Sequence, residues 1–545
     1  MNIGIDFDNT IASYDKLFYE VALDEDYIDR SWDGSGKTKL RNYLRSQPDG
    51  EKTWMKLQGL VYGKYMHCAE MMPGVANFIL SCKLRNHKVF IVSHKTEYGH
   101  YDLERISLRK EALKWMKSNR FFDPEYFGID KKNVFFAETR EEKVEKIAHL
   151  KCNWFIDDLP DVFKENHFPS KTKKILFGFS DPELLNDTVV LGSWRNISDK
   201  ILGKTTDEDV ISWSGRLTNR PIEKLKKISG RGNSRVYKIT NSDGTCYALK
   251  YYPDQTSDKR LRLKTEFNTL QLLYYNNITD IPKAIEKDND LNLGLYEWID
   301  GKIVFKPSVD DLSQAIDFVK VLYTLSQKIE REKNNLASDA CLSEKDLLNQ
   351  IEKRLLRLKL ESKSFPHLAI FLKNIFEPLW IEFRDESISF WPVESSDDGL
   401  PKEKQVLSPS DFGFHNSLKG EDGSLTFIDF DYFGWDDPVK LTADFLWHPG
   451  MNLNTDLKGR WKNAMLDIFS DDPQFGNRLN AAMPLYGLRW ALIVLNEFLP
   501  GFADRRKKAG ESKSYDIKKV REIQLKKAHI YCDKVKTMFS KTVFA

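Results

Sequence analysis

The sequence has no P-loop, no paired-cysteine motif and no long apolar run. The absence of G-x-x-x-x-G-K-[ST] removes one common nucleotide-binding motif. The six cysteines are widely scattered, without a C-x-x-C pair, which argues against a disulfide framework or a zinc site and is typical of reduced thiols. No segment approaches the roughly 18 apolar residues that a bilayer requires, and no basic-then-apolar leader opens the chain. We therefore expect a cytoplasmic protein without a membrane partner.

The chain also has almost no net charge. A formal charge of +2 creates no global field, which argues against nucleic acid as the partner. The length of 545 residues exceeds the roughly 250–300 residues that one core supports, so two or three domains are expected. Internal repeats, low-complexity tracts and coiled-coil heptads are all missing, which leaves the oligomeric state open.

Residues 1–204 alternate short apolar runs with helical patterns, which predicts an α/β domain with a parallel, Rossmann-like sheet. The expected strands are 3–7, 88–93, 133–136, 154–156 and 174–177. A mostly helical insertion at 13–68 separates the first two strands. We expect it to form a cap over the carboxyl edge of the sheet.

Residues 205–219 are polar without periodicity and are interpreted as a linker. The second domain is expected at 220–545, with an α+β, two-lobed organisation. Its small lobe, 220–300, contains expected strands at 234–240 and 245–251 around a turn signal, and a helix at 265–275. The large lobe, 301–545, is mostly helical. Its basic end, 504–541, is interpreted as a solvated helix face.

Two carboxylates follow the first expected strand at the spacing that phosphoryl chemistry needs. Asp6 lies where open α/β sheets place their ligands, and a carboxylate can attack phosphorus if a divalent cation offsets the charge repulsion. Asp8 can protonate the leaving oxygen and then activate water. Asn9 and Thr10 would form the tight turn that holds both. Asp6 and Asp8 are therefore candidate catalytic and metal-binding residues.

Later segments supply candidates for the remaining roles in this site. Ser93 ends an apolar run and offers a hydroxyl and an N–H to a phosphate oxygen. Lys143 is the candidate cation beside the phosphorylated aspartate, with Lys132 and Lys146 as competitors for the same role.

Asp157 and Asp158 follow the expected strand at 154–156 and would complete a Mg²⁺ site, with Asp161 helping from behind. The ordered set of Asp6 to Thr10, Ser93, Lys143 and Asp157 with Asp158 resembles the four motifs of the haloacid dehalogenase superfamily. The resemblance covers about residues 1–200. It implies a phosphatase, because family members with an acid at the position of Asp8 are usually phosphatases or phosphotransferases. It also implies that the insertion at 13–68 is a substrate-selecting cap.

The second domain opens with a glycine-containing loop between two expected strands. Such a loop can fold over nucleotide phosphates with its amides facing inward. Lys250, on the next strand, is placed to contact the α and β phosphates, and Glu266 on the following helix could pair with it. The candidate nucleotide-binding residues of the loop are Gly230, Gly232, Asn233 and Ser234.

The remaining candidates of the second domain lie after its sheet. Glu297 and Trp298 belong to the segment that joins the two lobes, a hinge whose backbone can form hydrogen bonds with adenine. Asp411 is the candidate base for an acceptor hydroxyl. Asn416 and Asp429 are candidate Mg²⁺ ligands, because carboxamide and carboxylate oxygens suit magnesium and nucleotide phosphates.

The segments around Asp411–Asn416 and Asp429–Asp431 resemble the aminoglycoside phosphotransferase and choline kinase-like family, over about residues 220–450. The resemblance implies a protein-kinase-like fold that uses Mg²⁺ and ATP, or another nucleoside triphosphate, to phosphorylate a small molecule. One departure is Pro409, which stands where the family usually has a histidine that organises the catalytic loop. Because both metal ligands are present, we expect an active kinase.

The two constellations together predict a bifunctional enzyme whose partners are a small-molecule phosphate ester and a small-molecule hydroxyl acceptor. If the kinase added a phosphate and the phosphatase removed the same phosphate, the net reaction would be ATP hydrolysis alone. We therefore expect the two activities to act on different positions of a substrate or on sequential intermediates. Adding a phosphate at one position and removing one from another would suit activation of a sugar, polyol or amino alcohol for surface-glycan assembly. Three alternatives stay open: end healing of nucleic acid, a regulatory protein with one inactive sensor domain, and nucleotidase activity in the first domain.

Overall fold

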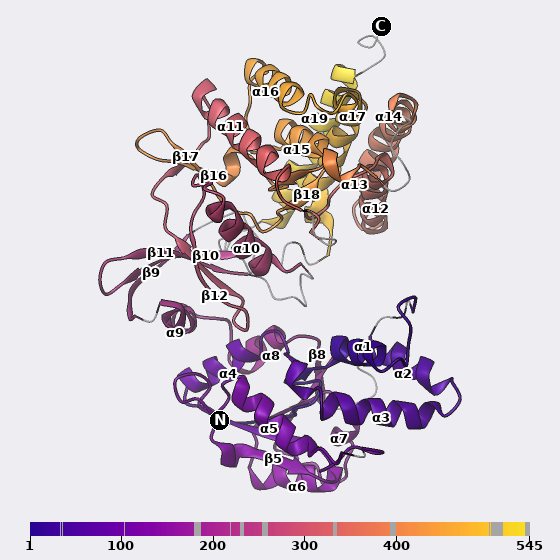
Figure 1. The fold of residues 1–545 in the computed structure, drawn as a ribbon, viewed down its shortest axis with the longest axis vertical. Helices are drawn as coiled ribbons and strands as arrows, with labels where there is room; N and C mark the ends of the chain where they lie inside the picture. The colour runs from indigo at the N-terminus through magenta and orange to yellow at the C-terminus, as the bar shows by residue number, and fades with distance from the viewer. Residues whose placement is uncertain are drawn as a thin grey trace. The chain divides into compact units, whose positions relative to one another are not determined.

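The computed structural model describes residues 1–545 except 33, 35, 103, 179–186, 219, 229–233, 253–259, 331–334, 393–398, 501, 503–515 and 540–545. The chain divides into two compact units. The first is chiefly Met1–Pro221, and the second is chiefly Ile222–Pro253, Arg260–Lys287 and Leu293–Ala545. Figure 1 colours the first unit indigo to violet and the second from magenta to yellow.

The first unit is built on a six-stranded parallel sheet, as the alternating pattern predicts. Its strand order is β5-β4-β1-β6-β7-β8. Renumbered along the chain, this is the order 3-2-1-4-5-6 of a doubly wound fold, whose ligand crevice lies where the order reverses, here between β1 and β6. The strands are β1 (Asn2–Ile5), β4 (Lys88–His94), β5 (Val134–Ala137), β6 (Trp154–Asp157), β7 (Lys173–Phe177) and β8 (Thr188–Leu191).

The expected insertion after β1 is helical. It contains α1 (Asp15–Asp24), α2 (Lys37–Arg45) and α3 (Gly50–Tyr62), which contact one another. A short ribbon of β2 (Ala12–Ser13) and β3 (Glu70–Met71) closes its base. The other helices are α4 (Val75–Leu84), α5 (Leu108–Ser118), α6 (Arg140–His149), α7 (Pro160–Phe163), α8 (Trp194–Ile201) and α9 (Asp207–Thr218).

Helix α9 corrects one expectation. The stretch 205–219, interpreted as a linker, is mostly helix, and α9 packs on α4. Asp209, 1% exposed, accepts hydrogen bonds from Arg85 at 2.6 Å and from the Ser81 hydroxyl at 2.7 Å. The first turn of α9 is acidic, which is favourable near a helix N-terminus. The segment reads as a linker because the contacts that fix it are more than a hundred residues away in the sequence.

The second unit begins with a five-stranded antiparallel sheet in the order β12-β13-β11-β10-β9. The lysine-rich β9 was not expected from the sequence; it is an edge strand, where lysines discourage pairing with other chains. Helix α10 (Arg262–Tyr275) contacts β13 of this sheet. The strands are β9 (Ile222–Ile228), β10 (Arg235–Asn241), β11 (Cys246–Tyr251), β12 (Ala284–Asp288) and β13 (Leu293–Glu297).

The rest of the second unit is mostly helical, with two small sheets that carry the site residues (Figure 1). These sheets are β14 (Lys302–Ile303) with β16 (Ser417–Lys419) and β17 (Leu425–Phe427), and β15 (Val406–Ser408) with β18 (Gly434–Asp436). The main helices are α11 (Val309–Ser326), α12 (Glu344–Ser362), α13 (Pro366–Phe371), α14 (Glu377–Phe390), α15 (Pro438–Trp447), α16 (Thr455–Ile468), α17 (Phe475–Ile493) and α19 (Ile517–Phe539). Among the described residues, no helix combines the length and apolar character that spanning a membrane requires.

Candidate active sites

The first site lies where the strand order of the parallel sheet reverses. The Asp6 N–H donates to the Ile156 carbonyl at 2.9 Å, which extends the β1–β6 pairing by one residue and brings Asp6 beside Asp157. Asn9 adopts a left-handed φ of 57°, and the Ile11 and Ala12 amides donate to the Phe7 carbonyl, forming the expected tight turn. The carboxyl ends of both strands therefore present their aspartates to one point.

Lys143 is the lysine that the structure brings to this point, rather than Lys132 or Lys146. Its ammonium, 1% exposed, lies 2.5 Å from Asp6 Oδ1 and 2.6 Å from Asp157 Oδ2. Thr139 caps α6, which sets the start of the helix, and Lys143 follows on its second turn. Burial alone would lower the pKa of the Lys143 ammonium, but Asp157 and Asp6 raise it above its usual value, so it stays charged.

Lys143 is surrounded by more carboxylates than one lysine can neutralise. Oxygens of Asp6, Asp157 and Asp158 all lie within 4.8 Å of one another. Burial raises the pKa of Asp6 despite the opposing effect of Lys143, and burial together with Asp157 raises the pKa of Asp158 to about 7. An all-oxygen donor set with surplus negative charge fits a hard divalent cation such as Mg²⁺. Asp161 does not join this group: its side chain is 52% exposed and lies 3.7 Å from Arg140.

Two further groups complete the predicted set in the first unit. Ser93, fully buried at the end of β4, has a hydroxyl without a hydrogen-bond partner among the described residues, which suits a phosphate oxygen. Asp8 accepts a hydrogen bond from the Tyr14 hydroxyl at 2.6 Å and pairs with Lys95 at 2.9 Å. Ser93 thus lies near the end of the strand that pairs with β1, and Asp8 has partners that sequence reasoning missed.

The helical insertion contributes a lysine to the same region. Lys37, the first residue of α2, donates to the Tyr62 hydroxyl at 2.8 Å and to Asn9 Oδ1 at 3.4 Å. Its ammonium also lies 4.8 Å from the ring centre of Phe18. Burial lowers the pKa of Lys37, while Asp158 and Asp8 oppose that effect. Because Lys37 contacts the residue that follows Asp8, the insertion reaches the crevice, and Lys37 is placed to meet a bound anion.

The second site is centred on Lys250. Its ammonium, on β11, lies 2.6 Å from Glu266 Oε2 of α10 and also contacts Asp429 Oδ1. The Tyr252 hydroxyl donates to the same Glu266 oxygen at 2.6 Å. Asp429 and Glu266 raise the pKa of Lys250 although burial opposes them. Lys250 is therefore a fixed positive charge between the strand, the helix and the aspartate segment.

Strand pairing places Asn416 beside Asp429. Ser417 of β16 pairs with Phe427 of β17, and the Ile428 N–H donates to the Asn416 carbonyl at 2.9 Å. The Asn416 amide donates through Nδ2 to the Asp411 carbonyl at 2.9 Å, which leaves its side-chain oxygen available. Asp429 itself has a positive φ of 70°, a conformation that surrounding structure must hold in place.

Oxygens of Glu266, Asp429 and Asp431 lie within 4.8 Å of one another. Burial and the neighbouring Asp429 raise the pKa of Asp431 to about 7, although Arg262 contacts its other side at 2.5 Å. This second surplus of carboxylate oxygen again fits Mg²⁺, and Asp429 with Asn416 would hold it.

Asp411 lies on the loop between β15 and β16, beside two histidines. His415 Nε2 is 2.9 Å from Asp411 Oδ1, and the His415 and His448 rings stack at 3.6 Å. Burial would raise the pKa of Asp411, but the hydrogen bond from His415 holds it below its usual range, so the carboxylate is ionised at neutral pH. An ionised carboxylate can accept a proton from an acceptor hydroxyl.

Ligand atoms of Asp411, His415 and His448 lie within 4.8 Å of one another. Gly450 N–H donates to His448 Nδ1 at 3.1 Å, so the proton of the neutral ring is on Nε2, the nitrogen that faces Asp411. Burial and His415 lower the pKa of His448 to about 3, which keeps that ring neutral.

The structure describes the predicted hinge but only part of the predicted glycine loop. Glu297 ends β13, where its N–H donates to the Lys283 carbonyl and its carboxylate accepts from the Lys283 N–H at 3.1 Å. Trp298 donates to Asp300 at 2.7 Å. The Ser234 hydroxyl is buried, with no hydrogen-bond partner among the described residues. Gly230, Gly232 and Asn233 lie outside the described residues.

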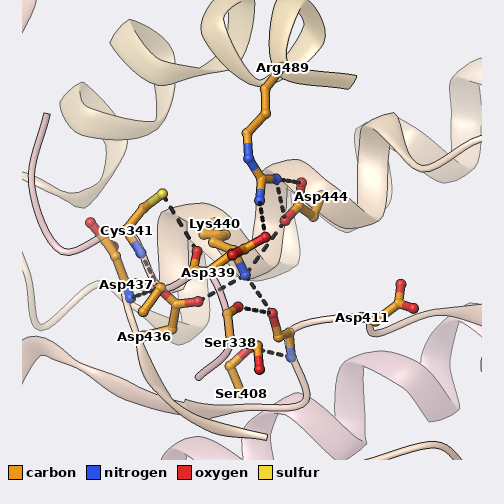
Figure 2. A network of polar contacts seen from close by, with 12 residues as sticks. Ser338, Asp339, Cys341, Ser408, Asp411, Asp436, Asp437, Lys440, Asp444 and Arg489 are labelled. Carbon is orange, nitrogen blue, oxygen red and sulfur yellow. Dashed lines mark hydrogen bonds and ion pairs between the residues drawn. The ribbon is translucent and has the colours of Figure 1, made fainter. Parts of the chain in front are cut away.

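The loop that carries Asp411 is tied to a buried polar network (Figure 2). Lys440 of α15 donates to the Ser410 hydroxyl at 2.7 Å and lies 2.9 Å from Asp436. Arg489 of α17 lies 3.1 Å from Asp444, which joins the same group. In the sequence Lys440 reads as an ordinary helix lysine, so nothing signalled this contact.

No protein-family model matches the sequence, and the curated proteins contain no match to it. Among solved structures, the chain is similar to an ethanolamine kinase from Plasmodium vivax, at 17% identity and a TM-score of 0.40, covering 61% of this chain and 92% of that one. It is similar to the choline kinase LicA from Streptococcus pneumoniae, at 13% identity and 0.39, covering 60% and 99%. A spectinomycin phosphotransferase, APH(9)-Ia, solved with ADP and spectinomycin, matches at 14% identity and 0.38, covering 58% and 98%.

Proposed function

We propose that the second unit is an ATP-dependent kinase that phosphorylates a hydroxyl group of a small molecule. The observation that carries this proposal is the joint position of Lys250, Glu266 and Asp429, with Asn416 beside Asp429 through strand pairing. Lys250 would bind the α and β phosphates of ATP, and Glu266 would keep its ammonium in place. Asp411 would accept the proton of the acceptor hydroxyl as that oxygen attacks the γ-phosphorus, while the bond from the γ-phosphorus to the β,γ-bridging oxygen breaks and ADP leaves.

A Mg²⁺ ion bound by Asp429 and Asn416 would neutralise charge on the phosphates. The Asp411 carboxylate needs no deprotonation before it acts, because its pKa lies below the usual range. The hydrogen bond from His415 orients the Asp411 carboxylate, whose side chain is 41% exposed and would be open to an acceptor. We infer a sugar, polyol or amino alcohol as the acceptor class, in line with the resemblance of the Asp411 and Asp429 segments.

We further propose that the first unit is a phosphatase of the haloacid dehalogenase type. Its support is the convergence of Asp6, Lys143 and Asp157 at the point where the strand order reverses. Asp6 would attack the phosphorus of a phosphate monoester, while Lys143 and the Ser93 hydroxyl bind the phosphoryl oxygens. Asp8 would give a proton to the leaving alcohol oxygen as the ester P–O bond breaks, and would then take a proton from the water that attacks the phosphorus on Asp6 and releases inorganic phosphate. Mg²⁺ held by Asp6, Asp157 and Asp158 would offset the charge of the phosphate.

Both proposals can be tested in one assay by phosphorus NMR. The whole chain is incubated with Mg²⁺, ATP and a pooled set of sugars, polyols, amino alcohols and their monophosphates. Asp411→Asn should lower formation of the new phosphoester by about 10²- to 10⁴-fold, the usual contribution of a general base. Asp6→Asn should abolish phosphate release without affecting the phosphoester. Asp422→Asn and Asp161→Asn, which change exposed aspartates outside both sites, serve as matched controls.

The outcomes separate the alternatives. Transfer that survives Asp411→Asn would refute the assigned base, and release that survives Asp6→Asn would refute the assigned nucleophile. A parallel set of nucleoside monophosphates and a short oligonucleotide identifies nucleotidase activity or end healing. If neither substitution changes any turnover, a sensor role replaces the enzymatic one. Both units acting on one identical phosphoester would contradict the idea of phosphate relocation for glycan precursors.

A further inference from the structure

The residue before Asp411 has a backbone conformation that its surroundings must enforce. Ser410 has φ 65°, in the left-handed region that residues other than glycine rarely adopt. Its N–H donates to the Ser408 hydroxyl at 3.0 Å, and its own hydroxyl donates to the Ser338 carbonyl at 3.0 Å. The Lys440 ammonium donates to the Ser410 hydroxyl oxygen at 2.7 Å. Three hydrogen bonds therefore fix the residue from which the candidate base extends.

Lys440 is itself held rigidly. It is 1% exposed, and its ammonium lies 2.9 Å from Asp436 Oδ2 and 3.7 Å from Asp444 Oδ2 (Figure 2). Asp436 Oδ1 accepts hydrogen bonds from the Cys341 and Asp437 amides, both at 2.9 Å. Neutralising Asp436 and Asp444 does not require a contact between Lys440 and Ser410. Of the three distances from the Lys440 ammonium, the one to the Ser410 hydroxyl is nevertheless the shortest.

We propose that Lys440 is a positioning residue for phosphoryl transfer, holding the backbone at Ser410 so that the Asp411 carboxylate stays directed at the acceptor hydroxyl. The inference rests on the proposed kinase function of the second unit. In this chain Pro409 and Ser410 precede the candidate base. The proposal is that Lys440 of α15, thirty residues after Ser410, holds the catalytic loop in place. Lys440 touches neither ATP nor acceptor in this role and acts only through Ser410.

The test needs variants that separate positioning from folding. Ser410→Ala removes the hydroxyl while leaving the ion pair of Lys440 with Asp436 intact. Lys440→Met combined with Asp436→Asn removes the ammonium without leaving a buried charge unpaired. Arg478→Met is the matched control: Arg478 is a buried cation, 4% exposed, whose partners are Asp437 and Asp472 and not Ser410.

Two readouts are measured on the whole chain. Hydrogen exchange of the 407–417 peptide reports whether the loop is held, and steady-state kinetics reports whether the base is directed. We expect Ser410→Ala and the Lys440 double variant to speed exchange in this peptide. We also expect them to lower kcat about 10- to 100-fold with the KM for ATP unchanged, because small misplacements of a catalytic group cost about that much. Arg478→Met should lower the melting temperature while leaving both readouts of the folded protein unchanged.

Three results would overturn parts of the argument in distinguishable ways. Unchanged exchange and kcat in Ser410→Ala would refute the role of Lys440. Equal effects in Arg478→Met and the Lys440 variant would show that the network is only structural, which also refutes it. A wild-type protein that transfers no phosphate would refute the proposed kinase instead, and the exchange data would still decide whether Lys440 holds the loop.

Discussion

Removing the Lys143 ammonium gives a sharp test of the first site. Lys143→Met keeps the length of the side chain but leaves Asp6 and Asp157 as buried carboxylates without their shared cation at 2.5 and 2.6 Å. Breaking a buried ion pair by removing one partner costs about 3–5 kcal/mol. For a unit of this size, each 1 kcal/mol shifts the melting temperature by about 2–4 °C, so a fall of about 6–20 °C is expected.

The loss should depend on pH in a defined direction. Burial already raises the pKa of Asp6, and removing Lys143 takes away the charge that opposes this effect. A carboxyl group whose pKa is higher in the folded than in the unfolded state binds more protons when folded, so stability increases as pH falls. The deficit of Lys143→Met should therefore be larger at pH 8 than at pH 5. Phosphate release should be lost at both values.

The measurement is differential scanning calorimetry of the whole chain, in which the transition of the second unit serves as an internal reference. Lys146→Met is the matched control, because Lys146 lies on the same helix and its ammonium lies over the Phe135 ring, 4.4 Å from the ring centre. It should change stability by about 1 kcal/mol or less. If both variants lower the melting temperature equally, or if Lys143→Met still releases phosphate, the assignment of Lys143 is wrong.

Three further predictions concern both sites. The pKa of Asp158 is raised to about 7, so without divalent metal the first unit should lose stability as pH rises from 5 to 8; Mg²⁺ or Asp158→Asn should flatten that dependence in thermal unfolding. Glu266→Gln should raise the KM for ATP and lower kcat/KM about 10- to 100-fold, whereas the exposed Glu286→Gln should change neither. Lys37→Gln should lower kcat/KM for phosphate esters about tenfold relative to the exposed Lys39→Gln, and equal activity of the two would exclude Lys37 from substrate binding.

Sequence analysis predicted the site residues that follow or lie on regular elements with a clear local pattern. Asp6 and Asp157 each follow a short apolar run, and parallel strands bring their carboxyl ends to one edge. Lys250 and Glu266 were predicted by the same kind of local reasoning, from a strand followed by a helix. The roles of these residues in catalysis stay predictions until the variants are measured.

The missed residues depend on packing between segments that are distant in the sequence. Lys95 meets Asp8 across 87 residues of chain, and Lys37 meets Tyr62 only once the helices of the insertion pack. Neither residue carries a local pattern that distinguishes it from a surface lysine. Asp161 was misplaced for the related reason that spacing along the chain does not tell which side of a single helical turn faces the site.

The balance of charge differs between the two candidate metal sites and the polar network around Lys440. In the first unit three closely spaced carboxylates share one lysine, and the crevice also contains the Asp8–Lys95 pair and Lys37. The site of the second unit has three carboxylates and two cations. The members are Asp6, Asp157 and Asp158 with Lys143, and Glu266, Asp429 and Asp431 with Lys250 and Arg262. In each cluster the pKa of one carboxylate, Asp158 or Asp431, is raised to about 7, first by burial and then by a neighbouring carboxylate.

The network around Lys440 is balanced instead. Its carboxylates are Asp339, Asp436 and Asp444, and its cations are Lys440, Arg354 and Arg489. Three charges of each sign leave nothing for a divalent cation to neutralise, and the carboxylates are held by hydrogen bonds and ion pairs from several elements. Such a network resists motion rather than recruiting a ligand. This is the property required of a support for the Asp411 loop, whereas the unbalanced clusters have the property required for binding Mg²⁺ and phosphate.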